Sequence, residues 1–149
     1  MITAFPYPPT PIGTGPRFHP PAATRQVDLQ CAKTQRYGVH LELFARNRVI
    51  IVPAGIRHRC LRTRWPVGII EVRGTHTLSD FFRVWGQPLS ETRLVGFKTT
   101  PGRPVRAYVA GKRWRGPLRS IPLRRHSNIV LQLGRYIRPH KVFLFPLGL

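Results

Sequence analysis

The sequence predicts an α+β fold: a small mixed β-sheet packed on one short helix in a β-grasp-like arrangement, with an extended proline-rich N-terminal arm. Three observations support this fold class. Residues 37–53 show an alternating segment, a polar turn and an apolar run, residues 75–88 have the pattern of one amphipathic helix, and short apolar runs recur after it. With 149 residues, 42% of them hydrophobic, the chain suffices for one domain and one modest core. We therefore expect one β-rich domain over residues 25–149, preceded by an arm over residues 1–24.

The arm contains seven prolines, a composition that favours extended, polyproline-like backbone over helix or sheet. We expect it to lie on a partner. Nothing in the first residues has the basic start and apolar core of a secretory signal, so the protein is either cytosolic or has lost a leader. No window reaches the roughly 20 apolar residues of a membrane-spanning helix.

The first strands surround a polar turn. Val39, Leu41 and Leu43 alternate with the other side chains of their segment, and the turn at residues 46–48 leads into VIIV, which together predict a β-hairpin ending at Pro53. Residues 54–67 form an arginine-rich loop with neither helical nor strand period. Residues 68–72, GIIEV, are typical of a buried strand.

The helix has clear boundaries. Thr77 followed three residues later by Asp80 predicts a capping box, and Gly86 and Pro88 predict the end. One apolar stripe is expected to pack on the sheet, formed by Leu78, Phe81, Phe82 and Trp85.

Later strands are predicted on either side of a Gly111–Lys112 turn and at residues 121–123 and 128–134. The tail at residues 142–149 is expected to add one more strand, ended by Pro146.

The charge is extreme. Lysine and arginine total 25 against five acids, giving a formal net charge of +20, which repels itself without counter-charge. Arginine, which predominates, favours bidentate contact with phosphate or carboxylate. The candidate partners are nucleic acid, an anionic lipid surface, an acidic polymer or the acidic face of an assembly. A protein of an acidic compartment or an arginine-biased genome is the alternative.

Two clusters of basic and aromatic residues are the candidate partner-binding sites, since arginine beside an indole can hold phosphate and stack on a ring. They comprise Arg57, Arg59, Arg62, Arg64 and Trp65, and Lys112, Arg113, Trp114 and Arg115. Either cluster could instead be a solvated loop whose tryptophan packs into the core. We expect Arg62→Ala with Arg64→Ala to weaken partner binding with little effect on stability, because exposed arginines contribute little to folding.

Cys31 and Cys60 are too few for a disulfide scaffold and do not form a zinc pattern. One disulfide between them would stabilise the fold by about 3 to 4 kcal/mol in the chain-entropy model. Two unrelated reduced thiols are the alternative.

No catalytic site, cofactor site or metal site is predicted. His58 and Cys60 could share a face as a nucleophilic dyad, but no acid is near in sequence. His40, His58, His76 and Glu71 lack any metal-ligand spacing. No glycine-rich phosphate loop is present.

From Leu29 to Leu149 the chain resembles a family of uncharacterised bacterial extracytoplasmic proteins, on the segments HLELFARNRVIIVPAGI, CLRTRWPVGIIEV, TLSDFFRVWGQPLS and NIVLQLG. In that family an HxH stretch and an HTHD-like motif suggest a metal site. Here Gly38 and His40 stand at the first motif, and residues 62–65 carry Arg, Thr, Arg and Trp at the second. Glu71 replaces a ligand-like histidine. Because arginine stays protonated, the resemblance implies a retained scaffold that has lost its metal, unless a residual site remains at His40.

The sequence favours a non-enzymatic binding or structural module outside the cytoplasm, periplasmic or associated with the cell envelope, docking on an anionic assembly or membrane surface. A cytosolic RNA- or DNA-binding protein is the alternative, although lysine is scarce and no RNA-binding motif is present. A degenerate metal-binding protein is a more distant alternative function.

Overall fold

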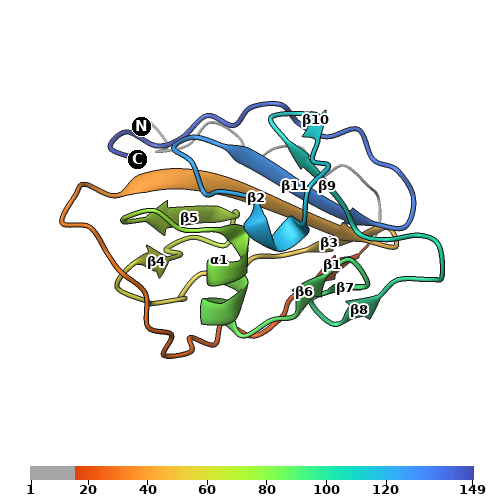
Figure 1. Ribbon diagram of the computed structural model, residues 1–149, viewed down its shortest axis with the longest axis horizontal. Helices are drawn as coiled ribbons and strands as arrows, with labels where there is room; N and C mark the ends of the chain where they lie inside the picture. The colour runs from red at the N-terminus through yellow and green to blue at the C-terminus, as the bar shows by residue number, and fades with distance from the viewer. Residues whose placement is uncertain (1–15) are drawn as a thin grey trace.

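A computed structural model describes residues 16–149 (Figure 1). It confirms the predicted α+β class, since one eight-residue helix accompanies a mixed sheet. The sheet follows the order β1, β3, β2, β11, β9, β10, and β5 joins β2 beside β3 while β4 pairs with β5. The strands are β1 (Arg17–Phe18), β2 (Tyr37–Ala45), β3 (Arg48–Ile50), β4 (Leu61–Arg62), β5 (Ile69–Val72), β9 (Arg106–Val109), β10 (Lys112–Arg113) and β11 (Asn128–Leu133).

The long strand β2 organises the sheet. It runs parallel to β11 on one side, and on the other it pairs antiparallel with β5 along its first half and with β3 along its second. Arg46 and Asn47 form the predicted turn into β3 and both have positive φ, as the tight turns that match strand twist require. Because successive side chains of a strand point to opposite faces, the residues of β2 contribute to both sides of the sheet.

The helix face of the sheet holds the main core. Val39, Leu41 and Leu43 of β2 are at most 2% exposed and pack with apolar side chains of β5, β9 and β11. Helix α1 (Leu78–Trp85) closes this face through its apolar stripe. The capping box of Thr77 and Asp80 is present, and Gly86 ends the helix with a left-handed φ of 79°. These predictions are confirmed.

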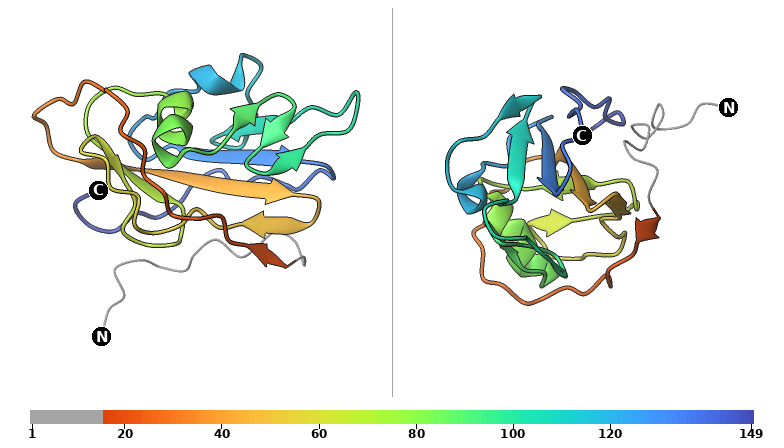
Figure 2. Two further views of the ribbon diagram at one scale, coloured as in Figure 1. Left: turned by 90° about the horizontal axis from the view of Figure 1, so that it is seen from below. Right: turned by 90° about the vertical axis from the view of Figure 1, so that its right-hand side faces the viewer.

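The opposite face of the sheet, here called the tail face, is covered by residues 135–149. Figure 2 shows this segment and α1 on opposite sides of the sheet. Phe143 and Leu149 pack on Ile69, and Phe143 stacks on His40 with 3.7 Å between ring centroids. The fold thus has three layers: helix, sheet and C-terminal segment.

Three sequence predictions need correction. The tail at residues 142–149 is not a strand, because it crosses the sheet face with its backbone outside the ladder. Residues 121–123 contribute only a single bridge, between Pro122 and Thr77, after the short 3-10 helix η1 (Leu118–Ser120). The turn between β9 and β10 lies at Ala110–Gly111, one residue earlier than predicted, since these two residues have positive φ.

Two features have no counterpart in the sequence predictions. A second sheet follows the helix, made of β6 (Leu89–Ser90), β7 (Arg93–Leu94) and β8 (Phe97–Lys98). Strand β4 lies inside the segment that was expected to be an irregular loop. All four are two-residue strands, too short to show a period.

The N-terminal segment from residue 16 onward contacts the domain itself. β1 runs parallel to β3, the indole nitrogen of Trp85 donates to the Pro21 carbonyl over 3.0 Å, and Arg25 N donates to Val84 O over 2.7 Å. Residues 1–15 of the predicted arm, with most of its prolines, lie outside the described residues. Across residues 16–149, none of the helices has both the length and the apolar character needed to span a bilayer.

Candidate anion-binding site and docking surface

The first predicted cluster lies on a loop that the fold holds firmly. Thr63 is buried, its hydroxyl donates to the Pro53 carbonyl over 2.6 Å and accepts from Ile56 N over 3.2 Å. Backbone bonds join Gly55 N to Thr63 O and His58 N to Leu61 O. These hydrogen bonds fix the loop as a hairpin, so its arginines extend from well-defined backbone positions.

Arg62 and Arg64 clamp a buried carboxylate. Glu71, on β5, is 1% exposed, and it faces Arg62 across the β4–β5 ladder. Arg62 Nε and Nη2 each lie 2.9 Å from Glu71 Oε1, and Arg64 Nε donates to Glu71 Oε2. The structure contradicts the premise of the expectation that these arginines contribute little to stability, because both pair with a buried carboxylate. We now expect that removing them destabilises the fold, since it would leave the Glu71 charge buried and unpaired.

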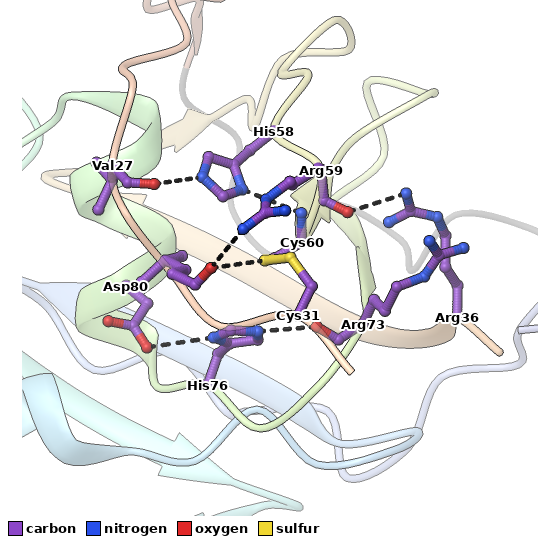
Figure 3. Close-up of a disulfide and its surroundings, with 10 residues drawn as sticks. Val27, Cys31, Arg36, His58, Arg59, Cys60, Arg73, His76 and Asp80 are labelled. Carbon is purple, nitrogen blue, oxygen red and sulfur yellow. Dashed lines mark hydrogen bonds and ion pairs between the residues drawn. A yellow bond between two sulfur atoms is a disulfide. The ribbon is translucent and has the colours of Figure 1, made fainter. Parts of the chain in front are cut away.

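Two further arginines join this pair. Arg36 directly precedes β2 and Arg73 directly follows β5, and since Tyr37 pairs with Val72 the two side chains extend on the tail face like Glu71. Figure 3 shows their guanidinium groups close together. Burial, together with the positive charges of Arg62 and Arg73, lowers the pKa of the Arg36 guanidinium below its ordinary value. We call Arg36, Arg62, Arg64 and Arg73 the arginine cluster.

The remaining residues of the first predicted site lie around this cluster. Arg57 and Arg59 are exposed on the loop, and Arg59 Nη2 donates to the Leu29 carbonyl over 3.3 Å. Trp65 is half-buried, with the Arg64 guanidinium 4.6 Å from its ring centroid. The structure therefore brings Arg57, Arg59, Arg62 and Arg64 to one hollow, whose lining also includes Arg36.

The second predicted cluster lies elsewhere. Lys112 and Arg113 form β10, at the opposite edge of the sheet from β4. Trp114 is half-buried, packs against the core, and donates from its indole nitrogen to Pro117 O over 3.0 Å. Arg115 is exposed. The two clusters thus do not form a single surface.

The His58–Cys60 dyad is excluded by its bonding. Cys60 forms a disulfide with Cys31, whose Cα lies 5.3 Å away, so no thiol remains. His58 Nδ1 accepts from Cys60 N over 3.0 Å, while Nε2 lies 2.6 Å from the Val27 carbonyl. The same disulfide fastens the N-terminal segment to the loop that carries Arg57 and Arg59 (Figure 3).

His40 is bonded at both ring nitrogens, which lie 2.7 Å from Asn128 Oδ1 and 2.8 Å from Val67 O. Burial lowers the pKa of His40 and outweighs these acceptors and Glu42, which raise it. Residues 16–149 contain no group of three or more histidine, cysteine or acidic side chains placed to hold a metal ion. The His40 ring also packs against the Phe143 ring.

The outer side of the C-terminal segment is apolar. Within residues 16–149, the large hydrophobic side chains that are exposed all lie on this segment: Tyr136 at 58%, Val142 at 75%, Leu144 at 66% and Leu147 at 103%. Arg135, Arg138 and Lys141 are exposed on the same segment. We call this surface the tail ridge.

Comparison with family models, with curated proteins and with solved structures finds no match to this chain. The resemblance drawn from the sequence motifs therefore stays a prediction. The structure does place its key positions together, because Gly38 and Arg62 both pair with Glu71.

Sequence reasoning missed Arg36, Arg73 and the tail ridge. Arg36 and Arg73 flank two predicted strands, and their proximity follows only from the antiparallel register of β2 and β5. The tail was expected to be a strand, which hid the fact that Phe143 and Phe145 face inward while Val142 and Leu144 face solvent.

Proposed function

We propose that this protein is a non-catalytic module that docks on an anionic membrane surface. The observation that carries the proposal is the tail ridge, where exposed apolar side chains and exposed cations occur together on one segment. Such a combination suits the boundary between lipid head groups and acyl chains, where apolar groups enter and basic groups meet anionic lipids. An acidic protein surface or a nucleic acid would attract the cations but would leave the aliphatic groups unused.

The uncompensated charge supports the same proposal. Among residues 16–149, which include all 25 lysines and arginines, only Arg62, Arg64 and Arg83 lie within ion-pair distance of a carboxylate, leaving 25 − 3 = 22 without one. Each basic residue close to an anionic bilayer contributes about 1 kcal/mol. The three cations of the tail ridge would thus add about 3 kcal/mol to the burial of Val142, Leu144 and Leu147.

The disulfide between Cys31 and Cys60 supports a location outside the cytoplasm, because such bonds persist in oxidising compartments. The family resemblance implies the same compartment. We propose that the docking surface is therefore a membrane leaflet facing the periplasm or the exterior, with the protein associated with the cell envelope.

We also propose that the scaffold is of the β-grasp type. Two features support this: the strand order β3, β2, β11, β9, whose central pair is parallel and whose outer pairs are antiparallel, and the single helix α1 across one face. On this scaffold the helix closes one side of the sheet, which leaves the other side for the C-terminal segment and its ridge.

The test is co-sedimentation of the full chain with vesicles of phosphatidylglycerol and phosphatidylcholine, compared with vesicles of phosphatidylcholine alone. We expect binding to the anionic vesicles only. Val142→Ser with Leu144→Ser and Leu147→Ser should weaken it at least about tenfold, since each removes a buried aliphatic group. Tryptophan fluorescence and thermal unfolding check that this variant folds.

The matched control is Thr99→Ser with Thr100→Ser, which changes side chains of another loop without touching the tail ridge. Equal vesicle binding by the ridge variant and the wild-type protein would overturn the proposal. So would failure to bind anionic vesicles combined with tight RNA binding whose affinity falls steeply with salt, which would indicate a nucleic-acid partner.

A further inference from the structure

The arginine cluster gathers more positive charge than the fold neutralises. Arg36, Arg62, Arg64 and Arg73 surround one carboxylate, Glu71, so the local charge is 4 − 1 = +3. The four positive charges repel one another. Within residues 16–149, neither the negative end of a helix nor a second carboxylate faces them. The fold holds these four guanidinium groups together through the registers of β2, β4 and β5.

Two N–H groups of the cluster are buried without a hydrogen-bond acceptor: Arg36 Nη1 and Arg73 Nε. Buried donors are almost always satisfied in folded proteins, so unsatisfied ones of the same sign in one place indicate an absent acceptor. Arg36 Nη2 donates to the Arg59 carbonyl over 3.1 Å, which fixes the orientation of its guanidinium plane. The Arg59 carbonyl thus holds Arg36 at Nη2, while the buried Nη1 has no acceptor among residues 16–149.

Arg36 also lines a hollow, whereas Arg73 lies outside it. The lining includes Arg36, Arg57, Arg59, Arg62 and Arg64, together with the buried Thr63. Arg62 uses Nε and Nη2 on Glu71, and Arg64 uses Nε, while a guanidinium carries five N–H donors. Each of these two arginines therefore keeps donors for a second acceptor while Glu71 sets its position.

We propose that the arginine cluster is a binding site for a phosphate group, presented by a lipid head group or by a soluble phosphomonoester. A phosphate offers several acceptor oxygens and up to two negative charges, which match the planar forks and the local excess of +3. Carried by a lipid, it deepens the proposed docking function and rests on it. Glu71 is not a ligand in this site; it is a positioning residue for Arg62 and Arg64.

The location is consistent with docking. Glu71 faces the same side of the sheet as Gly38 and Ile69, where Phe145 and Leu149 pack. A Cβ atom at Gly38 would lie 2.6 Å from the Phe145 ring, so the C-terminal segment lies directly on this part of the sheet. The cluster therefore lies beside the segment that carries the tail ridge.

The test measures binding of inorganic phosphate to the full chain by calorimetry at constant ionic strength, with chloride as the reference anion. We expect saturable binding that Arg36→Ala weakens about tenfold, the effect of losing one charge-assisted hydrogen bond. The phosphate affinity of Arg36→Lys should lie between those of the wild-type protein and Arg36→Ala, because lysine keeps the positive charge but lacks the planar guanidinium group. Arg36→Ala is expected to fold, since Arg36 has no carboxylate partner.

The matched control is Arg103→Ala, which removes the same charge from an exposed turn. Equal loss of phosphate binding in both variants, or no saturable binding by the wild-type protein, would overturn the site. Two further arms identify the source of the phosphate group. Preference for phosphatidic acid over phosphatidylglycerol vesicles that Arg36→Ala abolishes assigns it to a lipid, whereas glycerol phosphate binding without that preference assigns it to a soluble ligand.

The two proposals fail separately. If Arg36→Ala binds phosphate as well as the wild-type protein while the ridge variant loses vesicle binding, the arginine site is wrong and the docking function stands. If phosphate binding depends on Arg36 but the wild-type protein ignores anionic vesicles, the site stands and the docking function is wrong.

Discussion

The two faces of the central sheet are both buried, yet they are closed by different chemistry. On the helix face, Val39, Leu41 and Leu43 meet α1 through apolar contacts that tolerate exchange of similar side chains. On the tail face, His40 and Glu42 of the same strand meet specific partners, since Glu42 binds the His140 ring over 3.0 Å. A local pattern of apolar residues can specify the helix face. The tail face depends on pairs such as Glu42 and His140, which are 98 positions apart in the sequence.

The polar side chains of β11 fasten the C-terminal segment in the same way. Asn128 Nδ2 donates to the His140 carbonyl over 2.9 Å. Gln132 Oε1 accepts from Ile137 N over 3.1 Å and from Arg106 Nη2 over 3.4 Å. These bonds satisfy buried amides that would otherwise destabilise the sheet, so the tail face is stable only while the segment is in place.

The helix face should give the largest stability effect. Phe81 is 0% exposed and contacts Phe82 and Trp85, so Phe81→Ala is expected to lower the free energy of unfolding by about 4 kcal/mol through lost contacts and a cavity. Urea unfolding followed by circular dichroism measures this. Ser79→Ala on the same helix is the control. A loss below about 1 kcal/mol would mean that the face repacks freely.

The second-largest loss of stability is expected on the tail face, where Arg62 and Arg64 bind Glu71. Arg62→Ala with Arg64→Ala leaves Glu71 buried and unpaired, and we expect a loss of about 3 kcal/mol. Arg57→Ala with Arg59→Ala removes the same charge from exposed positions and should change stability by less than about 0.5 kcal/mol. Equal midpoints of urea unfolding for the two variants would contradict the clamp.

A smaller effect is expected from the amide that fastens the tail. Asn128→Ala removes the donor to His140 O and the acceptor at His40 Nδ1, and should cost about 2 kcal/mol. It should also raise hydrogen exchange at residues 137–145 before it affects β2. Uniform exchange across the whole sheet would show that the tail face and the helix face unfold together.

The smallest effect is a pH dependence. Because burial lowers the pKa of His40, the unfolded chain binds a proton more readily than the folded one, and stability falls as the pH drops below the ordinary histidine pKa. We expect this loss of stability to begin near the ordinary histidine pKa of about 6.5 and to grow as the pH falls further. His40→Gln should remove that part of the slope in urea unfolding, while His19→Gln, at an exposed position, should keep it. An unchanged slope in His40→Gln would show that His40 is charged when folded.

The sequence could predict those elements whose specification is local. The capping box of Thr77 and Asp80, the stripe on α1, and the hairpin turn at Arg46 and Asn47 each lie within a few residues of one another, and all three are found. The arginine clamp could not be predicted, because Arg62 and Arg64 look exposed until β4 pairs with β5. The tail was mistaken for a strand because alternation of Val142, Phe143, Leu144 and Phe145 has the same period whether or not the backbone joins a ladder.

The position of β11 in the sheet has a consequence for synthesis. β11 lies between β2 and β9, yet Asn128–Leu133 follows every one of its partners in sequence. A growing chain therefore cannot close the sheet until translation has passed Leu133, and β2 must wait for a partner about 90 residues away, an arrangement that slows folding. Until then the strand edges of β2 and β9 that β11 will occupy are unpaired, and unpaired edges of this kind favour aggregation.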